Sequence, residues 1–542
     1  MTTMTGGRAI VEALRAEGVS CIFGVPGEEM LEIMDATLTE PTLRFIHTRH
    51  EQGAAYMAYG YARSTGVPGV CLSTAGPGAT NLLTGVAAAY KAFLPMIVLT
   101  GRPPRPFLEK DSIQEIDQVG IYKPVTKWSY EITDAARLPD IMEKAFRIAL
   151  ADPQGPVHLS IPGDVPALKI ETSPKRPEQY RVDNPLRCSG EDVVRAGRLL
   201  VQARAPVIVA GRELIQAGCT NLVQDLAELT GIPVATTVGQ PDAFPNTHPL
   251  GVGPMGQWGG WDPANKLVAG ADLLLAIGER FEFDMSAVRY AYGVVSPTTR
   301  IVQINRFSGA LGEVYPLELG IVSDLTWFLQ TLLNWLREQR VQPRASEAAA
   351  LKRAWEQKRA GLIDPGAGRL QPEFVVQSIR RWTRPDAVIS SEVGMFLRQI
   401  RPYFDTYAPN TILYAENFAC LGSALPMSLG AKLGWPDRQA ICLCGDGGFT
   451  FNAAEIETAV RERLKATVVI FDDQSYGSIR AMQKNRYGRV VGADFGDVDF
   501  AAMARSLGAH GQTITRPAEL EGAFTEALAA DKLAVLDVRI KP

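Results

Sequence analysis

Short apolar runs recur along this chain of 542 residues, and stretches with a helical pattern separate them. The runs are apolar throughout, which is typical of strands that are covered on both faces, and helices between successive strands imply that the strands run parallel. The sequence therefore predicts an α/β protein built on parallel sheets flanked by helices. The runs are CIFGV, GVCLST, MIVLTG and VHLSI in the first third, APVIVAG, IPVATT, DLLLAIG and RIVQIN in the middle, and AVISSEV, AICLCGDG, ATVVIFDD and AVLDVRI at the end.

Two stretches interrupt this pattern. Residues 171–192 are rich in proline and charge, and residues 341–372 combine a charged helical piece with proline and glycine. A chain of this length is too long for a single hydrophobic core. We therefore expect three α/β domains, at residues 1–180, 190–340 and 360–542.

Charge and composition argue against several classes of protein. The formal net charge is −4, so no electrostatic feature favours nucleic acid as a partner. The apolar runs are far shorter than the ~18 residues that span a bilayer. The first residues lack the basic and apolar regions of a signal peptide, so we expect a cytoplasmic protein without a membrane partner. The seven cysteines form no CxxC pair, which favours buried thiols.

Three carboxylates bracket one strand–loop–helix–strand unit at residues 440–473. Asp446 follows the first strand in a glycine-rich turn, and Asp472 and Asp473 follow the second strand. In a right-handed βαβ unit both strands end at the same edge of the sheet, where ligands bind. The turn amides attract phosphate, and Mg²⁺ would offset the repulsion from the acids. The residues alone support a phosphate–Mg²⁺ site and a set of solvated turn acids equally.

The motif GDGGFTFN, closed by VVIFDD, resembles the diphosphate-anchoring signature of thiamine diphosphate (ThDP) enzymes. The resemblance implies that the side chains of Asp446 and Asp473 and the backbone carbonyl of Ser475 bind Mg²⁺. The family closes this motif with two asparagines, so the Asp-Asp pair here places an additional negative charge beside the metal. Further cofactor contacts implied by the resemblance come from Gly445, Gly447, Gly448, Tyr476 and Gly477.

Glu51 stands in a second segment, RHEQGAAYMAYGYAR, which has a helical pattern and a face of small residues. An acid in the first turn of a helix is favoured by the helix dipole and needs no catalytic role. Together with CLSTAGPGATNLLTG, however, the segment resembles the pyrimidine-binding domain of acetohydroxyacid (acetolactate) synthases. The resemblance implies that Glu51 is catalytic, because it hydrogen-bonds the aminopyrimidine ring of ThDP and shares a proton with the ring nitrogen. It also places Pro26 at the cofactor.

The segment AENFACLGSALPMSLGAKLG resembles the part of these enzymes that bends ThDP into a V shape. The resemblance implies a bulky aliphatic contact from Leu421, a backbone carbonyl from Ala419 to the exocyclic amine, and a further contact from Gly394. On the residues alone, a buried helix is the preferred explanation for Leu421.

The central segment resembles the part of acetohydroxyacid synthases that cradles FAD, with several departures. GVGPMG fits the pattern GxGxxG, but it follows FPNTHPL rather than a strand, so we expect no dinucleotide fingerprint there. GQWGG stands where the family has Gly-Met-His-Gly-Thr, Asn305 replaces the usual acid, and RFEFD replaces RFDDR. These departures argue against FAD as a cofactor without excluding it.

Acetohydroxyacid synthases carry a tryptophan near the acceptor site, where this chain has Met482, and Gln114 matches a family residue that approaches the reacting carbon. The five histidines include no His-His pair of the kind that pyruvate decarboxylases use for protonation, which favours capture of a second carbonyl compound. We therefore expect a ThDP- and Mg²⁺-dependent decarboxylating carboligase that resembles acetolactate synthase and joins a 2-oxo acid to a carbonyl acceptor. The alternative is a 2-oxo acid decarboxylase or C–C lyase similar to benzoylformate decarboxylase or benzaldehyde lyase.

Other features leave their roles open at this point. Arg102 and Arg480 are candidate anchors for a substrate carboxylate or structural arginines, and Lys91 and Phe93 depart from the family pattern. The resemblance implies a homodimer or homotetramer whose active sites lie between subunits. A non-catalytic ThDP-binding protein is disfavoured because Glu51 and the GDG motif are both retained. A nicotinamide oxidoreductase rests only on GVGPMG.

Overall fold

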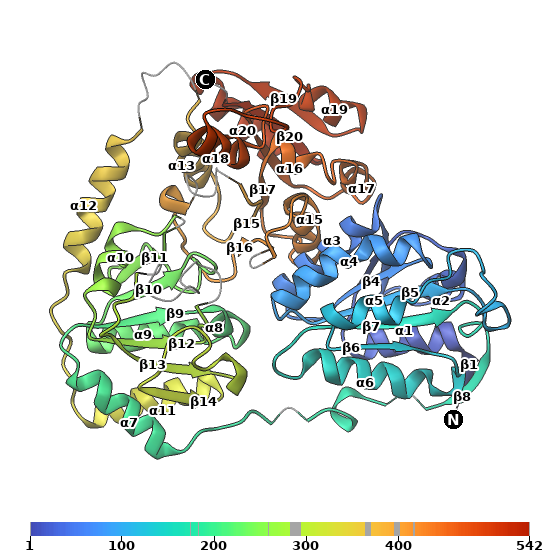
Figure 1. The fold of residues 1–542 in the computed structure, drawn as a ribbon, viewed down its shortest axis with the longest axis horizontal. Helices are drawn as coiled ribbons and strands as arrows, with labels where there is room; N and C mark the ends of the chain where they lie inside the picture. Colours follow the sequence, from blue (N-terminus) through green and yellow to red (C-terminus); the bar gives the residue numbers. More distant parts are fainter. Residues whose placement is uncertain are drawn as a thin grey trace.

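The structure is a computed structural model that describes residues 2–173, 175–182, 184–257, 259–281, 294–363, 370–394, 401–415 and 418–540. Its strands form three parallel sheets of six strands each, one in each third of the chain. Figure 1 shows the sheets and their flanking helices as three lobes, with the N-terminal lobe at the right, the central lobe at the left and the C-terminal lobe at the top. The predicted α/β class is confirmed. Among the described residues, no helix is long and apolar enough to cross a membrane.

The N-terminal sheet has the strand order β3-β2-β4-β5-β7-β6, and all neighbouring strands are parallel. A short antiparallel pair, β1 and β8, closes the domain. The strands are β1 Thr2–Thr5, β2 Cys21–Gly24, β3 Arg44–His47, β4 Gly69–Ser73, β5 Met96–Arg102, β6 Trp128–Glu131, β7 Pro156–Pro162 and β8 Lys169–Thr172; the helices are α1 Gly6–Ala16, α2 Leu31–Thr37, α3 Glu51–Thr65, α4 Pro77–Lys91, α5 Gln118–Tyr122 and α6 Leu138–Leu150.

The central sheet has the order β11-β10-β9-β12-β13-β14. The GVGPMG sequence does not form a phosphate-binding turn between a strand and a helix, because its first five residues are the edge strand β11 itself. The strands are β9 Pro206–Ala210, β10 Val234–Thr237, β11 Gly251–Met255, β12 Leu273–Ile277, β13 Arg300–Asn305 and β14 Leu319–Val322; the helices are α7 Gly190–Gln202, α8 Arg212–Gln216, α9 Thr220–Thr230, α10 Asp262–Ala269 and α11 Leu325–Glu338, followed by α12 Ala348–Gly361, which leads to the next domain.

The C-terminal sheet has the order β16-β15-β17-β18-β20-β19. The helix expected after the GDGGF turn is shorter than its pattern indicated, since α17 begins only at Glu455 and Ala454 is exposed. The strands are β15 Val388–Ser391, β16 Ile412–Leu413, β17 Ala440–Gly445, β18 Thr467–Asp472, β19 His510–Ile514 and β20 Ala534–Arg539; the helices are α13 Pro372–Trp382, α15 Ala424–Gly434, α16 Asp446–Phe449, α17 Glu455–Arg461, α18 Gly477–Tyr487, α19 Phe500–Ser506 and α20 Leu520–Ala529.

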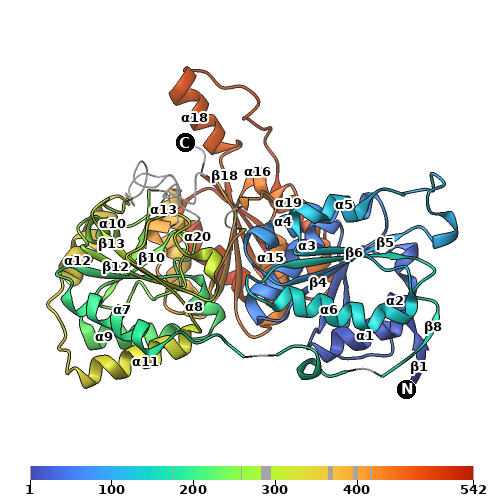
Figure 2. The same ribbon diagram turned by 60° about the horizontal axis from the view of Figure 1, so that its bottom comes forward.

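Helices α3 and α15 join the N-terminal and C-terminal lobes (Figure 2). The helices pack so closely that a Cβ atom on Gly60 would collide with the backbone of Met427, and one on Gly430 would collide with the backbone of Met57. The small residues of α3 permit this approach, and the Tyr59 hydroxyl donates to the carbonyl of Tyr414 at 3.2 Å. Both helices contribute to one hydrophobic core that spans the two domains, which fixes the two sheet edges relative to each other.

Candidate active site

Asp446 and Asp473 lie at the carboxyl edge of the C-terminal sheet. The strands that precede them, β17 and β18, are parallel neighbours, and Gly445 pairs with Phe471 at their ends. Asp446 is 3% exposed, and its Oδ1 accepts from the N–H of Gly447 at 2.9 Å. Burial, with Asp473 as the next cause, raises the pKa of Asp446 to about 7, and burial also raises the pKa of Asp473. The edge therefore presents two carboxylates that repel one another.

The donor atoms at this edge are oxygens, which are the ligands that Mg²⁺ prefers. Ser475 lies beside them, because its backbone N–H and its hydroxyl both donate to Asp473 Oδ1, at 3.1 and 3.0 Å. A cation between Asp446 and Asp473 would offset the burial that raises both pKa values and the effect of Asp473 on Asp446. The residues present thus fit a Mg²⁺ ion, although a group of three or more acidic, cysteine or histidine ligands does not occur within the described part of the chain.

Asp472 has a different role from its neighbour Asp473. Its side chain is buried, its Oδ1 accepts from the N–H of Gln474 at 3.0 Å, and its Oδ2 lies 2.9 Å from the guanidinium of Arg539. Arg539 stands opposite Asp472 in the register of β18 and β20, and it also pairs with Asp537, at 2.8 Å, and with Asp497. Asp472 is therefore compensated within the protein, which explains how the chain tolerates an acid where the family has asparagine.

The glycines of the two motifs are needed for close packing. A Cβ atom on Gly447 would lie 2.7 Å from the ring of Tyr476, and one on Gly477 would lie 2.6 Å from Asp473 Oδ2. Tyr476 in turn packs edge-on against Phe495, with 4.5 Å between the ring centroids. The turn that carries Asp446 and the turn that carries Asp473 consequently fit against each other only without these side chains.

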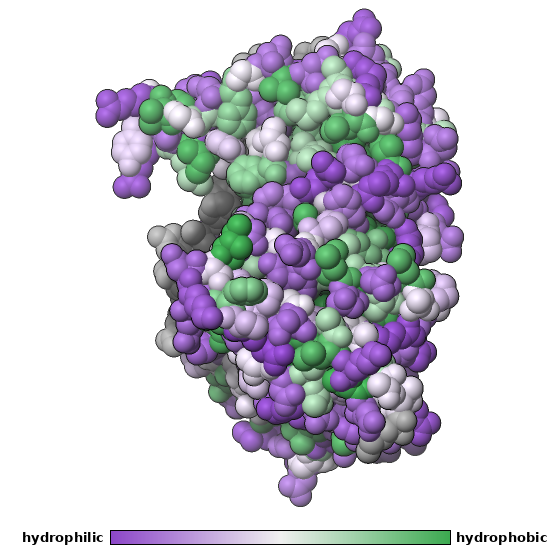
Figure 3. Space-filling model, turned by 90° about the vertical axis from the view of Figure 1, so that its right-hand side faces the viewer, coloured by the Kyte–Doolittle hydropathy of each residue, from purple (hydrophilic) through white to green (hydrophobic). Residues whose placement is uncertain are grey.

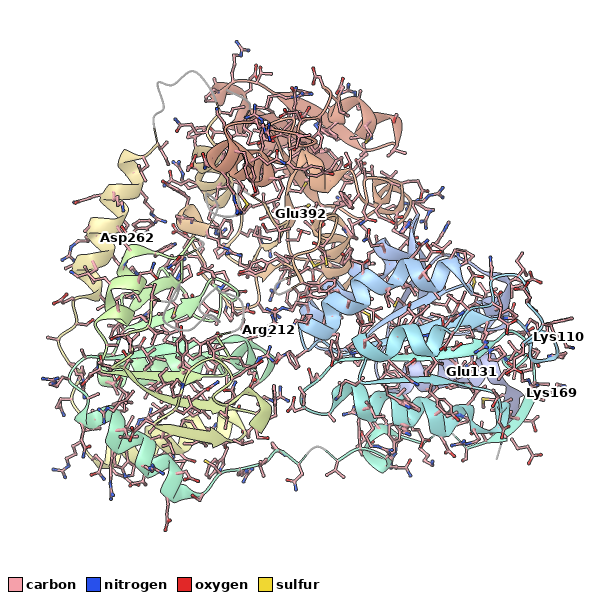
Figure 4. All side chains as sticks on the ribbon, in the orientation of Figure 1. Lys110, Glu131, Lys169, Arg212, Asp262 and Glu392 are labelled. Atoms are coloured by element: carbon pink, nitrogen blue, oxygen red, sulfur yellow. The ribbon has the colours of Figure 1, made fainter. Side chains whose placement is uncertain are left out.

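Glu392 is a part of the site that the sequence did not reveal. It is fully buried, its Oε1 accepts from the backbone N–H of Ser423 at 2.9 Å, and its Oε2 would lie 2.7 Å from a Cβ atom on Gly448. Burial raises its pKa to about 7. Figure 4 labels this residue in the C-terminal lobe. No motif marks a lone glutamate at the end of a strand, so its contacts with two separate turns were not foreseeable.

Gly394 closely follows Glu392 in the chain, and Ala419 and Leu421 closely precede Ser423, whose N–H donates to Glu392. Gly394 and Ala419 both have positive φ angles, of 154° and 53°, and Ala419 is exposed. Leu421 is half-buried in the turn before α15, so the explanation as a buried helix does not hold. Residues 416 and 417 of this segment lie outside the described residues.

The N-terminal half of the candidate site gathers around Thr74, which follows β4. Glu51, the first residue of α3, is 8% exposed, and its Oε2 accepts from the Asn81 side chain at 3.0 Å. Gln114 has a φ angle of 63°, and its Oε1 lies 3.4 Å from Thr74 Oγ1. Pro26 is exposed in the loop after β2, next to Gly27, whose Cβ position would contact Thr74. The predicted residues of this domain thus converge on one edge of its sheet.

The two half-sites draw their hydrogen bonds from different domains. The partners given above for Glu51 and Gln114 belong to the N-terminal domain, and those for Asp446 and Asp473 belong to the C-terminal domain. His50 lies at the N-cap of α3, where its Nδ1 accepts from the N–H of Gln52 at 3.0 Å, so this histidine stabilises the helix start.

A cleft of about 530 Å³ separates the central domain from the N-terminal domain. Arg212 and Arg280 line it, and Arg280 stacks on the ring of Phe93 at 3.7 Å. Figure 4 shows Arg212 on the side of the central lobe that faces the N-terminal lobe. Asn305 donates to Glu213 Oε1 at 3.1 Å, so this asparagine is engaged within the protein. Most of the RFEFD segment and Trp258 of GQWGG lie outside the described residues.

Met482 and Arg480 lie on α18, which projects from the body of the molecule (Figures 2 and 3). No residue of this helix is buried, and Met482 is 50% exposed. Arg480 pairs with Asp494 at 2.7 Å, and Arg102 pairs with Glu131 and with Glu115. Both candidate anchors are therefore already held by acids of the same chain.

Comparisons with known proteins agree with this architecture. The chain matches the thiamine pyrophosphate enzyme family in the N-terminal TPP binding domain over residues 4–121, the central domain over residues 193–332 and the C-terminal TPP binding domain over residues 392–538. The probable acetolactate synthase large subunit of Methanocaldococcus jannaschii is 34% identical, over 99% of this chain and 92% of that protein. The acetolactate synthase isozyme 3 large subunit of Escherichia coli is 31% identical, over 100% of this chain and 95% of that protein.

Proposed function

The chain belongs to the thiamine pyrophosphate (ThDP) enzymes, and from this premise we propose that Glu51, Asp446 and Asp473 serve a decarboxylating carboligation of 2-oxo acids. It is a ThDP-dependent enzyme of the acetolactate synthase type. One observation carries this assignment of residues. The N-terminal sheet has a buried acid at the start of α3, and the C-terminal sheet has two acids at the carboxyl ends of neighbouring strands. A simple decarboxylase or C–C lyase is the less favoured alternative.

Mg²⁺ is the cation that we propose for the C-terminal half-site. Asp446 and Asp473 would bind it by their carboxylates and Ser475 by its carbonyl, because oxygen ligands and a diphosphate suit this ion. The turn of Gly445, Gly447 and Gly448 would admit the diphosphate close to the backbone, with Tyr476 and Gly477 on the opposite side.

Glu51 would act on the pyrimidine end of the cofactor. When bound, ThDP supplies the nucleophilic carbon and the electron sink for decarboxylation. Glu51 Oε2 is held by Asn81, and a Cβ atom on Gly78 would lie 3.3 Å from Oε1, so a side chain at position 78 would crowd that oxygen. Glu51 would hold and return a proton at a ring nitrogen. Pro26, Gly394, Ala419 and Leu421 would orient the rings, and Gln114 would face the reacting carbon.

The assembly that we propose is a homodimer or homotetramer in which the N-terminal half-site of one subunit faces the C-terminal half-site of another. The separate hydrogen-bond sets of Glu51 and Asp446 support it. We also propose domain limits of 1–180, 190–340 and 360–542, because each of these ranges contains one six-stranded sheet. An absorbance spectrum of the purified protein tests whether FAD is bound.

Incubation with pyruvate, Mg²⁺ and ThDP tests the proposed function. We expect CO₂ release together with a chiral carboligation product, detected by mass spectrometry and chiral chromatography. A screen of other 2-oxo acids and carbonyl acceptors then defines the two substrates. Release of CO₂ with only a free aldehyde would show a decarboxylase instead, and the absence of ThDP binding in calorimetry would overturn the cofactor assignment.

A further inference from the structure

Glu455, the first residue of α17, is a carboxylate with no exposed surface. It belongs to the C-terminal domain, but its Oε1 accepts from the backbone N–H of Arg49 at 3.0 Å and of His50 at 3.1 Å, both in the N-terminal domain. Its Oε2 accepts from Arg49 N–H at 3.2 Å and from the hydroxyl of Thr458 at 2.6 Å. Burial raises the pKa of Glu455, and the hydrogen bonds from Thr458, Arg49 and His50 act in the opposite direction, so both carboxylate oxygens are held by donors at this contact between the domains.

The two amides that Glu455 binds directly precede Glu51 in the chain. His50 is the N-cap of α3 and Arg49 precedes it, so both amides lie just outside the hydrogen-bond ladder of the helix. An acidic group at a helix N-terminus is also favoured by the helix dipole. The chain therefore leaves the start of α3 to be satisfied by a carboxylate of another domain.

Neighbouring residues reinforce the same contact. The Asn452 amide donates to Gln52 Oε1 at 3.1 Å and to the carbonyl of Gly422 at 2.8 Å. Gly53 must lack a side chain, because its Cβ would collide with Glu455 Oε1. The first turn of α3, the start of α17 and the turn after Leu421 are thus joined at one buried point.

We propose that Glu455 is a positioning residue, which fixes the first turn of α3 against the C-terminal domain and thereby sets where Glu51 presents its carboxylate. The inference rests on the proposed role of Glu51. Glu455 follows the turn that carries Asp446, so one buried carboxylate connects the motif of one half-site to the acid of the other. Glu455 touches neither substrate nor cofactor and acts through the backbone at Arg49 and His50.

The full-length Glu455→Gln variant tests this role, with Glu457→Gln as the matched control. Glu457 lies on the same helix and also faces Arg49, at 4.0 Å, but at the surface. The first measurement is amide hydrogen exchange of residues 49–53 without cofactor, by mass spectrometry. The second is exchange of the reactive carbon-bound proton of ThDP in the protein saturated with Mg²⁺ and ThDP, by NMR.

In Glu455→Gln we expect amide exchange at residues 49–53 to accelerate at least about 10-fold, because the anchored turn opens more easily. We expect cofactor proton exchange to slow at least about 10-fold with ThDP still bound, because a small displacement of a catalytic group is costly. Glu457→Gln should change neither rate by more than about 2-fold, since exposed ion pairs contribute little.

Gly53→Ala provides a second variant in case Glu455→Gln does not fold. It displaces the same contact without removing a charge, and the same two changes are expected. The proposal would be overturned if both variants exchanged their amides at the wild-type rate. It would also be overturned if the amides exchanged faster while the carbon-bound proton of ThDP still exchanged at the wild-type rate. If the wild-type protein bound no ThDP, the proposed function would fail, while amide exchange would still decide whether Glu455 holds the start of α3.

Discussion

The two half-sites handle negative charge in opposite ways. In the N-terminal half, Glu51 is buried at a helix start with an amide as its side-chain partner, and a second acid, Glu29, accepts from the Thr74 hydroxyl at 2.6 Å. In the C-terminal half, Asp446, Asp472 and Asp473 share one sheet edge, and Arg539 compensates the second of them. A buried carboxylate held by a neutral amide suits proton exchange with a ligand. Crowded carboxylates with raised pKa values suit a cation instead.

Removal of Asp446 should have the largest effect, because it takes away a direct ligand of the proposed cation. Asp446→Ala is expected to weaken Mg²⁺–ThDP binding by more than about 100-fold, since even loss of an outer partner of a metal ligand costs 10–100-fold. Isothermal titration calorimetry measures it. Binding within a factor of three of wild type would remove Asp446 from the metal site.

Removal of the acidic group of Glu51 should affect turnover more than binding. Glu51→Gln keeps the size of the side chain but cannot hold a proton, so kcat is expected to fall about 100-fold or more. The ThDP dissociation constant should change by less than about 5-fold. A variant that loses binding and keeps kcat would erase the contrast between the two half-sites.

Arg539 should matter for stability rather than for chemistry. Arg539→Gln leaves Asp472 and Asp537 without their counter-charge, and we expect a loss of about 2–3 kcal/mol in the free energy of unfolding, less than for a fully buried pair because Arg539 is partly exposed. Adding Asp472→Asn should recover part of it. Chemical denaturation of the single and double variants measures this coupling, and additive effects would contradict the pairing.

Glu392 predicts a pH dependence of stability. Its pKa is raised by burial from 4.5 to about 7 in the folded protein, so the folded state binds the proton more tightly than the unfolded state. The contribution of Glu392 to the free energy of unfolding is therefore full below about pH 4.5 and is lost as the pH rises towards 7. Between pH 5 and pH 8, wild type should lose about 2 kcal/mol relative to Glu392→Gln. Thermal unfolding of both proteins at the two pH values tests this, and parallel pH curves would refute it.

The smallest effect is expected at Asp473. Asp473→Asn restores the residue that the family usually carries, and an amide oxygen can still bind Mg²⁺. Calorimetry should find ThDP binding preserved within about 3-fold, or tighter. A loss as large as that of Asp446→Ala would show that the acid itself is required at this position.

The apolar runs identified the inner strands of all three sheets and missed their edges. Every predicted run became an inner strand, while the edge strands β3, β6, β11, β14, β16 and β19 were not among the predicted runs. An inner strand is covered on both faces and must be apolar throughout. Edge strands need not be apolar throughout, so the apolar pattern does not identify them. Strand β6 is only half-buried along its length, β16 has two residues, and β11 contains glycine and proline.

The residues of the candidate site also divide into those that the sequence predicted and those that it did not. Asp446, Asp473 and Glu51 stand in local motifs, so their place at the carboxyl edges of two sheets followed from strand order in the chain. Whether they act as assigned is for the experiments above to decide. Glu392 stands in no such motif, and Glu455 lies within the unit at residues 440–473 without any local signal of its distant partner, so both were missed.

The sequence by itself determined the α/β class, the inner strands and the candidate acids, because local apolar pattern and glycine-rich turns are properties of consecutive residues. Only the tertiary structure decided which acids are compensated and which are left for a ligand. Arg539 reaches Asp472 through the pairing of β20 with β18, and Glu455 reaches Arg49 across 406 residues of chain. Such partners are chosen by the packing of whole domains, where a buried charge must find its counterpart wherever the fold brings one.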